Sequence, residues 1–382
     1  MAGMQSSHRQ AGAGQAGAGQ TAPVQTAPVQ TASAIRLTSF SHGGGCGCKI
    51  APGVLSEILR SGGAQGVPFA LPPQLLVGLE TADDAAVYQL NEQQALIATT
   101  DFFMPIVDDP YEFGRIAATN ALSDVYAMGG TPIMALALVG MPIDRLPLDV
   151  IRRILQGGES ICAEAGIPVA GGHTIDSVEP IYGLVALGLV HPKRIKRNAS
   201  ARSGDALVLG KPLGVGILSA ALKKEQLDED GYRRMITSTT RLNTPGRALA
   251  ELDAVHAMTD VTGFGLLGHL LELARGSGLR AKLQFSQVPL LAGVAELAQR
   301  GFVTGASGRN WDGYGSQVAL DSSIDPVMRA LLTDPQTSGG LLVACEPQAV
   351  PEVIRLFRGE GFEEACVIGT LQDGLPGIDV TA

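Results

Sequence analysis

The stretch that decides how this chain folds and acts is Ser41-His42-Gly43-Gly44-Gly45-Cys46-Gly47-Cys48-Lys49-Ile50. It is too rich in glycine to favour a helix or a strand, because glycine loses the most conformational entropy on folding and packs no side chain. Glycine-rich backbone presents N–H groups to anions, a lysine adds a positive charge suited to phosphate, and an ionised cysteine is a nucleophile. The stretch therefore predicts a site that handles phosphate beside a sulfur-like nucleophile.

Three other kinds of site would use parts of this stretch, and the remaining sequence argues against each. The run 42–45 is similar to the oxyanion strand of esterases, but no G-x-S-x-G nucleophile turn follows it. Cys46 and Cys48 lack the C-x₂₋₄-C spacing and the second ligand pair of a structural zinc site. Lys49 is followed by Ile50, where a P-loop has a hydroxyl residue. A nucleotide site here would be of a different kind.

Composition limits the class of protein and its partners. A chain of 382 residues exceeds what one hydrophobic core usually organises, so we expect two domains. The net charge of −9 argues against non-specific binding to nucleic acid or to a membrane surface, and favours a small-molecule partner. Five cysteines without disulfide-framework spacing, and no secretory or membrane-spanning apolar run, predict a cytoplasmic protein. Three of them, Cys162, Cys345 and Cys366, are interpreted as buried and inert thiols.

The chain divides into a tail and two domains. Residues 1–34 contain AGAGQ twice and TAPVQ twice, a composition that cannot bury enough apolar area to fold, so this tail is predicted to be disordered. Beyond it, β-like and helix-like runs alternate, which indicates an α/β or α+β fold. A charged connection ends near residue 203, giving predicted domains at 35–203 and 204–382. We predict strands at 85–90, 95–100, 133–139, 181–190 and 206–209, and helices at 112–128 and 148–165.

Several carboxylates lie next to apolar runs, where an acid is costly without a counter-charge. Asp83 and Asp84 precede one predicted strand, and Asp101 follows the next. Asp124 lies four residues after Asn120 and therefore shares its helix face, and Asp260 precedes a further helical run. Oxygen-rich sites of this kind suit Mg²⁺ bound to nucleotide phosphates. The alternative, that any one acid merely caps a turn or a helix, has equal weight on sequence alone.

These runs together resemble the selenophosphate synthetases, also called selenide, water dikinases. The resemblance extends nearly to the C-terminus and leaves out only the repetitive tail. The matching segments are 37–38, 41–50, 80–88, 99–103, 115–124, 170–174, 258–269 and 334–341.

The resemblance implies a fold and a reaction. The fold would have two α/β domains like those of aminoimidazole ribonucleotide synthetase, usually in a homodimer. The reaction would convert ATP, selenide and water into selenophosphate, AMP and orthophosphate, with Mg²⁺ as cofactor. Selenophosphate supplies selenium for selenocysteine and for selenium-modified tRNA. The implied partners are ATP, selenide and a second copy of the chain. A selenium-delivery protein is a further candidate partner.

The resemblance also implies roles for individual residues. Cys46 matches the catalytic chalcogen position, Lys49 a second essential residue, and Cys48 an accessory cysteine. The matches to metal positions are Asp84, Asp124 and Asp260, and Asp101 matches a nucleotide or metal position. The matches to nucleotide-binding positions are Thr81, Ala82, Asp83, Gly172, His173 and Thr174, together with Lys49 and Asp124.

Phosphoryl transfer mainly requires positioning and neutralisation of charge, which the acids with Mg²⁺ and Lys49 would supply. Since selenide is already a strong nucleophile, we hypothesise that Cys46 holds or delivers selenium while the glycine-rich stretch folds as a lid that excludes water. Two alternatives stay open. One is another ATP-dependent enzyme of the same superfamily, and the other is a non-catalytic protein that binds selenium or a metal through Cys46 and Cys48.

Overall fold

The computed structural model describes residues 35–50, 54, 58, 71–78 and 83–382. The predicted tail at 1–34, as well as Thr81 and Ala82, lie outside the described residues. The chain from Arg36 to Ala382 forms one compact unit. In it the predicted α/β architecture is confirmed, as two sheets with associated helices. No helix in the described part of the chain has both the length and the apolar character needed to cross a bilayer.

The first sheet has six strands in the order β1-β2-β3-β6-β4-β5. All neighbours run antiparallel except β4 and β5, which are parallel. Its strands are β1 (Leu75–Val77), β2 (Ala86–Gln89), β3 (Ala95–Phe103), β4 (Thr131–Met141), β5 (Val169–Asp176) and β6 (Ile181–Val190).

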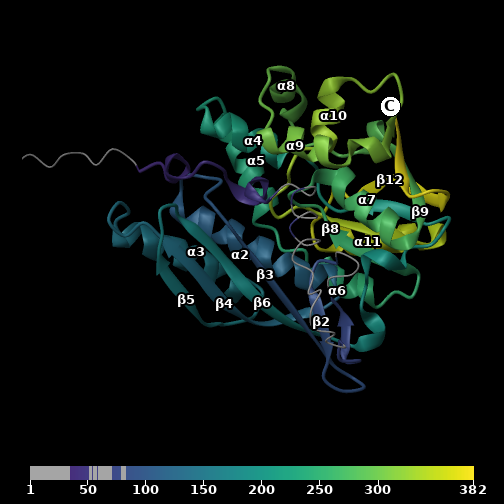
Figure 1. The fold of residues 1–382 in the computed structure, drawn as a ribbon, viewed down its shortest axis with the longest axis horizontal. Helices are drawn as coiled ribbons and strands as arrows, with labels where there is room; N and C mark the ends of the chain where they lie inside the picture. The colour runs from purple at the N-terminus through teal and green to yellow at the C-terminus, as the bar shows by residue number, and fades with distance from the viewer. Residues whose placement is uncertain (1–34, 51–53, 55–57, 59–70, 79–82) are drawn as a thin grey trace, which may run out of the picture. The chain divides into compact units, whose positions relative to one another are not determined.

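Helices α2 (Pro110–Ala127) and α3 (Leu148–Glu164) pack against each other and lie on one face of this sheet, as Figure 1 shows. Burial alternates along β3, so that Ile97, Thr99 and Asp101 are buried while Thr100 and Phe102 are exposed. Alternate strand residues point to opposite faces, so the first set lies on the helix-covered face. Polar groups on that face of β3 are thereby placed against α2.

The second sheet has seven strands in the order β10-β13-β9-β12-β7-β11-β8. Helix α7 (Gly265–Ser277) packs on one face, and α6 (Pro245–Ala250) and α11 (Val350–Gly359) pack on the other. The strands are β7 (Ala206–Leu209), β8 (Val255–Asp260), β9 (Leu279–Gln284), β10 (Val318–Leu320), β11 (Leu341–Cys345), β12 (Cys366–Asp373) and β13 (Gly377–Thr381). The remaining helices are α4 (Val215–Lys223), α5 (Glu229–Thr239), α8 (Val294–Gln299), α9 (Gly305–Tyr314) and α10 (Pro326–Leu332).

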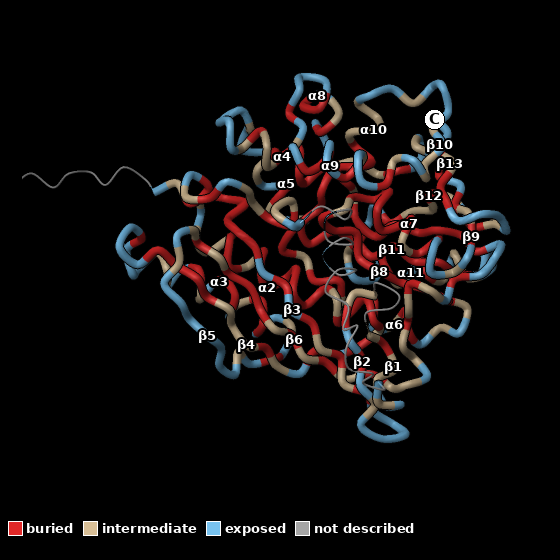
Figure 2. Tube along the Cα trace, in the orientation of Figure 1, coloured by how far each residue is buried: buried red, intermediate tan, exposed pale blue. Residues whose placement is uncertain are grey.

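Strands β7, β11 and β8, which end the strand order of this sheet, are buried along their whole length, and β11 is drawn in red in Figure 2. The sequences of β7 and β11 are accordingly continuous apolar runs, because both faces of the sheet are covered by helices, whereas β8 also contains His256, Thr259 and Asp260. Asp260 is the last residue of β8, and the chain beyond β7 begins with Gly210 and Lys211. Polar residues therefore lie in the interior at the ends of these buried strands.

The local structure differs from the sequence expectations in two places. Asp101 lies inside β3 rather than after it, because the strand continues to Phe103. The Gly172-His173-Thr174 run, for which no strand was predicted, lies in β5. Gly172 has φ +154°, and a Cβ there would lie 2.1 Å from the carbonyl oxygen of Ala137 on β4, so the strand needs glycine for this close approach.

Candidate functional site

The glycine-rich stretch folds as a tight turn rather than an irregular loop. Gly45–Cys48 form one turn of 3₁₀-helix, in which the N–H of Lys49 donates to the carbonyl of Cys46. Gly45 has φ +55°, and a Cβ at this position would lie 2.3 Å from Oγ1 of Thr337. Glycine is required here for both the backbone conformation and the space. The turn is thereby seated directly on the 334–340 segment.

Cys46 is fully buried at the centre of this turn. Its N–H donates to Oγ1 of Thr337 at 3.0 Å, and its Sγ donates to Oδ1 of Asn120 on α2 at 3.2 Å. The carbonyl of Cys46 packs so closely on the segment after β8 that a Cβ at Gly263 would lie 2.7 Å from it. Burial is the main reason that the pKa of this thiol is raised well above its usual value, and the negative charge of Asp101 is the second. The raised pKa keeps the thiol protonated. Cys48 is half-buried beside it.

Asn120 and Asp101 join the turn to the first sheet. The side-chain amide of Asn120 donates to Oδ2 of Asp101 at 2.5 Å, and Nζ of Lys49 lies 3.4 Å from the same oxygen. Desolvation alone would lower the pKa of Lys49, but Asp101 and the neighbouring acids raise it above its usual value. The Lys49 side chain is 38% exposed, so it remains accessible to a ligand.

Three further acids converge beside this network. Asp84 precedes β2, Asp124 lies on α2 and Asp260 ends β8, and one carboxylate oxygen of each lies within 4.8 Å of the other two. Hydroxyl groups orient two of them: Thr259 donates to Asp84 at 2.8 Å, and Thr99 donates to Asp124 at 2.5 Å. The acids are adjacent in space although the sequence separates them widely.

The environment of this acid cluster favours a cation. Burial raises the pKa of Asp84, Asp124 and Asp260, and for the first two the charge of Asp260 raises it further. Oδ2 of Asp84 and Oδ2 of Asp260 are buried without a hydrogen-bond partner among the described residues. Buried carboxylate oxygens with no donor are unfavourable unless a metal ion or a cation balances them. Because all the donors are oxygens, the cluster fits Mg²⁺.

The remaining predicted site residues lie elsewhere. Asp83, which directly precedes Asp84 of the acid cluster, accepts a hydrogen bond from the N–H of Asn198 at 2.7 Å. Gly172, His173 and Thr174 are exposed on β5. This strand is an edge of the first sheet, with β4 and β6 between it and β3. The structure does not bring these three residues to the acid cluster of the same chain.

Several residues of the site were not singled out from the sequence. Ser338 has a positive φ of 52°, and its N–H donates to Oδ1 of Asn120 at 2.7 Å. Lys211 is buried, and its Nζ donates to the carbonyl of Ser338 at 2.8 Å. A lysine directly after a fully apolar strand was the available signal for Lys211. No local signal marks Thr99 or Thr259, whose roles depend on acids far away in the sequence.

The chain is similar to known proteins over most of its length. Residues 82–190 match the family described as AIR synthase related protein, N-terminal domain, and residues 202–378 match its C-terminal domain. The curated protein "Selenide, water dikinase" of Burkholderia pseudomallei is 68% identical over 349 residues, 91% of this chain and 98% of that protein. Proteins with the same name from Dechloromonas aromatica and Rhizobium meliloti are 64% and 58% identical, each covering 91% of this chain and 98% of the relative.

Solved structures share the fold at low sequence identity. Thiamine-monophosphate kinase from Stenotrophomonas maltophilia aligns with a TM-score of 0.58 at 19% identity, over 87% of this chain and 96% of that one. A HypE-HypF complex contains a chain that aligns with a TM-score of 0.63 at 14% identity, over 86% and 95% of the two chains. These similarities establish the two-sheet architecture and nothing about the substrate.

Proposed function

Because this chain belongs to the selenide, water dikinase family, we propose that it is an ATP-dependent enzyme that makes selenophosphate, AMP and orthophosphate from ATP, selenide and water. The observation that carries this proposal is the hydrogen-bonded network of Cys46, Asn120, Asp101 and Lys49 beside the three-acid cluster. It joins a thiol, a cation and a cation-binding site in one place.

Magnesium fits the acid cluster, and Asp84, Asp124 and Asp260 would hold it. Bound there, Mg²⁺ would neutralise the charge of the triphosphate oxygens. Thr99 and Thr259 fix the orientation of two of these carboxylates through their hydroxyl groups. Asp101 holds the Lys49 ammonium near the same cluster, where it would neutralise charge that develops on the transferred phosphoryl group.

The role proposed for Cys46 is to hold or deliver selenium. The raised pKa of the buried thiol argues against a role in proton transfer at neutral pH, and handling of selenium would require its thiolate form. A cavity of about 300 Å³ lies beside the turn and is lined by Gly43, Gly44 and Gly47 and by two cations, Lys223 and Arg309. Hydrogen selenide is an anion at neutral pH, so this cavity suits its approach, whether it is free or handed over by a delivery protein.

A homodimer is proposed from the face of the first sheet that α2 and α3 leave uncovered. Phe102 on β3 is 49% exposed and Ile175 on β5 is 55% exposed. His173 pairs with Leu138, so it lies on this same face, two residues from Ile175. An apolar sheet face of this kind is typical of a surface buried between subunits. A second copy would cover it and could bring its Gly172, His173 and Thr174 to a nucleotide held by the first copy.

Three further assignments stay proposals. The domain boundary near residue 203 lies between β6, which ends at Val190, and β7, which begins at Ala206. Thr81, Ala82 and Asp83 are proposed as nucleotide contacts, because they directly precede Asp84 of the acid cluster. A cytoplasmic location is proposed because the five cysteines are all free thiols.

Phosphorus NMR tests the proposed reaction. The protein is incubated anaerobically with ATP, Mg²⁺ and selenide, with Cys46→Ser and an EDTA-treated sample as controls. Signals of selenophosphate, AMP and orthophosphate in equal amounts, absent from both controls, are the expected result. Consumption of ATP without selenophosphate would indicate another acceptor on the same scaffold. No consumption at all would favour a non-catalytic selenium- or metal-binding protein.

A further inference from the structure

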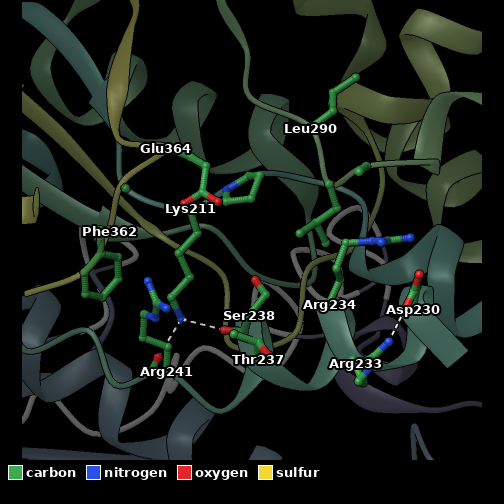
Figure 3. Close-up of a pocket in the computed structure, with 14 residues that line it drawn as sticks. Lys211, Asp230, Arg233, Arg234, Thr237, Ser238, Arg241, Leu290, Phe362 and Glu364 are labelled. Atoms are coloured by element: carbon green, nitrogen blue, oxygen red, sulfur yellow. Dashed lines mark hydrogen bonds and ion pairs between the residues drawn. The ribbon is translucent and has the colours of Figure 1, made fainter.

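A second cavity, of about 600 Å³, lies among elements of the C-terminal sheet and its helices. Its walls are the residues that follow β7, one side of α5, the segment 290–292 and the region of Phe362 (Figure 3). None of the residues of the cysteine turn, the Asp101 network or the acid cluster lines it. Its volume is within the range of pockets that bind small molecules.

The lining of this cavity is cationic. Four basic residues and two acidic residues contribute to it, and one acid, Asp230, already forms an ion pair with Arg233. Nε of Arg234 is buried and has no hydrogen-bond partner in the described part of the chain. A buried N–H without an acceptor is unfavourable, so this position favours a ligand that brings an oxygen.

A second guanidinium is held in place nearby. Arg241 donates to the carbonyl of Gly361 and lies over the ring of Phe362, 5.4 Å from its centroid. A guanidinium fixed in this way loses little freedom when it binds, and its planar array of donors matches phosphate and carboxylate oxygens. Thr237 and Ser238 lie one helical turn after Arg233 and Arg234 on α5, and both line the cavity.

We propose that this cavity is a binding site for a phosphate monoester of about the size of a nucleoside monophosphate. The phosphate group lies beside Arg234 and accepts hydrogen bonds from hydroxyl groups of α5, while Arg241 adds positive charge from the other side of the cavity. The uncharged part of the ligand lies against the apolar wall formed by Leu290, Leu291 and Ala292. The binding proposal does not depend on the reaction proposed above.

The buried amine of Lys211 connects this cavity with the cysteine turn. Its Nζ donates to the carbonyls of Ser238 and Arg241 at 3.2 and 2.7 Å, and to the carbonyl of Ser338 at 2.8 Å. The N–H of Ser338 donates in turn to Asn120, the acceptor of the Cys46 thiol. This chain of hydrogen bonds joins the end of α5 to the surroundings of Cys46.

Calorimetric titration of the full chain in EDTA buffer tests the binding site, with AMP and ribose 5-phosphate as probes. We expect both to bind, and we expect Arg234→Gln to weaken binding at least tenfold. Thr237→Glu, which adds a negative charge at an exposed position of α5 without removing packing, is expected to do the same. Arg355→Gln is the matched control, because Arg355 is an exposed arginine on α11 paired with Glu352.

Two outcomes would overturn the proposal: neither probe binds, or both probes bind equally well to the parent, Arg234→Gln and Thr237→Glu. Alkylation of Cys46 by iodoacetamide, followed by mass spectrometry of its peptide, tests the connection through Lys211. Saturating ribose 5-phosphate is expected to change the alkylation rate at least twofold in the parent and not in Arg234→Gln. An unchanged rate in a parent protein that binds the ligand would disprove the connection.

Discussion

Lys49 is the cation nearest to the acids of the site, and its ion pair with Asp101 keeps it charged while leaving it accessible. Charge that develops during phosphoryl transfer is stabilised by such a group more than the bound substrate is. We expect Lys49→Ala to reduce kcat about 100-fold, as the loss of one charge-stabilising group typically does, and to change the KM for ATP less than threefold. Steady-state AMP formation measures both, with the exposed Lys193→Ala as control. A raised KM with normal kcat would contradict this role.

The two cysteines of the turn differ in burial, and this difference separates their roles. Cys46 is fully buried and bonded to Asn120, whereas Cys48 is only half-buried. We expect Cys46→Ser to reduce the rate of selenophosphate formation at least 100-fold, both with free selenide and with a physiological selenium donor. This is the size of effect that removal of one donor that stabilises the transition state typically has. Cys48→Ser is the matched control and is expected to stay within about threefold of the parent. Full activity of Cys46→Ser with both selenium sources would refute the selenium-handling role.

At this scale the sequence predicted the identities of the acids better than their arrangement. Asp84 and Asp260 were singled out because they adjoin apolar runs or a helical run, and Asp124 because it shares a helix face with Asn120. The resemblance assigned all three to metal positions, and the structure brings them together. Their convergence was not predictable from spacing, since it depends on the packing of one sheet against residues from another. Oriented hydroxyls such as that of Thr259 were missed for the same reason, because a threonine has no local signal for the acid it contacts.

Among the elements, the 3₁₀ turn at Gly45–Cys48 depends on one backbone conformation. A non-glycine residue at φ +55° costs about 1 kcal/mol or more, and a Cβ at Gly45 would also displace Thr337. We expect Gly45→Ala to increase the rate of Cys46 alkylation and to lower kcat at least tenfold, because the turn no longer seats the thiol. Gly308→Ala in α9 is the control, since a Cβ there meets nothing within 4 Å. Equal alkylation rates in the two variants would contradict this account of the turn.

Helix α4 has a buried carboxylate at its N-terminus. Oδ2 of Asp334 accepts from the N–H groups of Gly216 and Ile217, while Oδ1 is buried without a partner in the part of the chain described here. Burial raises the pKa of Asp334 to about 7, although hydrogen bonds from Gln336 and the helix lower it. The folded state then binds more protons than the unfolded state between about pH 4 and pH 7.

The contribution of this group to the free energy of unfolding therefore rises as the pH falls from 7 towards 4. Above pH 7 the carboxylate is charged, and the full cost of burying that charge lowers the stability of the folded state. Asp334→Asn keeps an oxygen acceptor for the helix and removes the charge. We expect this variant to be more stable than the parent at pH 8, with a difference that shrinks by at most about 1.4 kcal/mol per pH unit as the pH falls below 7. Urea unfolding at a series of pH values measures the difference, and a pH-independent difference would be inconsistent with the raised pKa.

The elements that the sequence predicted are all present, whereas β1 and β5 of the first sheet and the strands after β7 were not predicted. The predicted strands 181–190 and 206–209 are confirmed to the residue, because long apolar runs bounded by polar residues mark them clearly. Strand β5 was missed because Gly171 and Gly172 indicate a turn. Both have φ near +150°, a conformation that only glycine adopts readily, so the strand does not follow the ordinary β pattern.

At the scale of the molecule, the uncovered face of the first sheet predicts the subunit contact. We expect the protein to be a dimer in solution, and Ile175→Asp to convert it to monomers, because a charge on an apolar interface is costly to bury. Leu375→Asp, 84% exposed between β12 and β13, is the control. Sedimentation analysis measures both variants. A parent protein that is monomeric, or an Ile175→Asp variant that stays dimeric, would exclude this face as the contact.

The bond between the N–H of Cys46 and the hydroxyl of Thr337 joins residues 291 positions apart. During synthesis at about 5–20 residues per second, roughly 15–60 s pass between the appearance of the thiol and that of its partner. Chain segments of such wide separation also meet late in folding, because closing a long loop costs entropy before any contact forms. An unfinished chain on the ribosome thus exposes Cys46 without the segment that encloses it, and the enclosure can form only after Thr337 has been made.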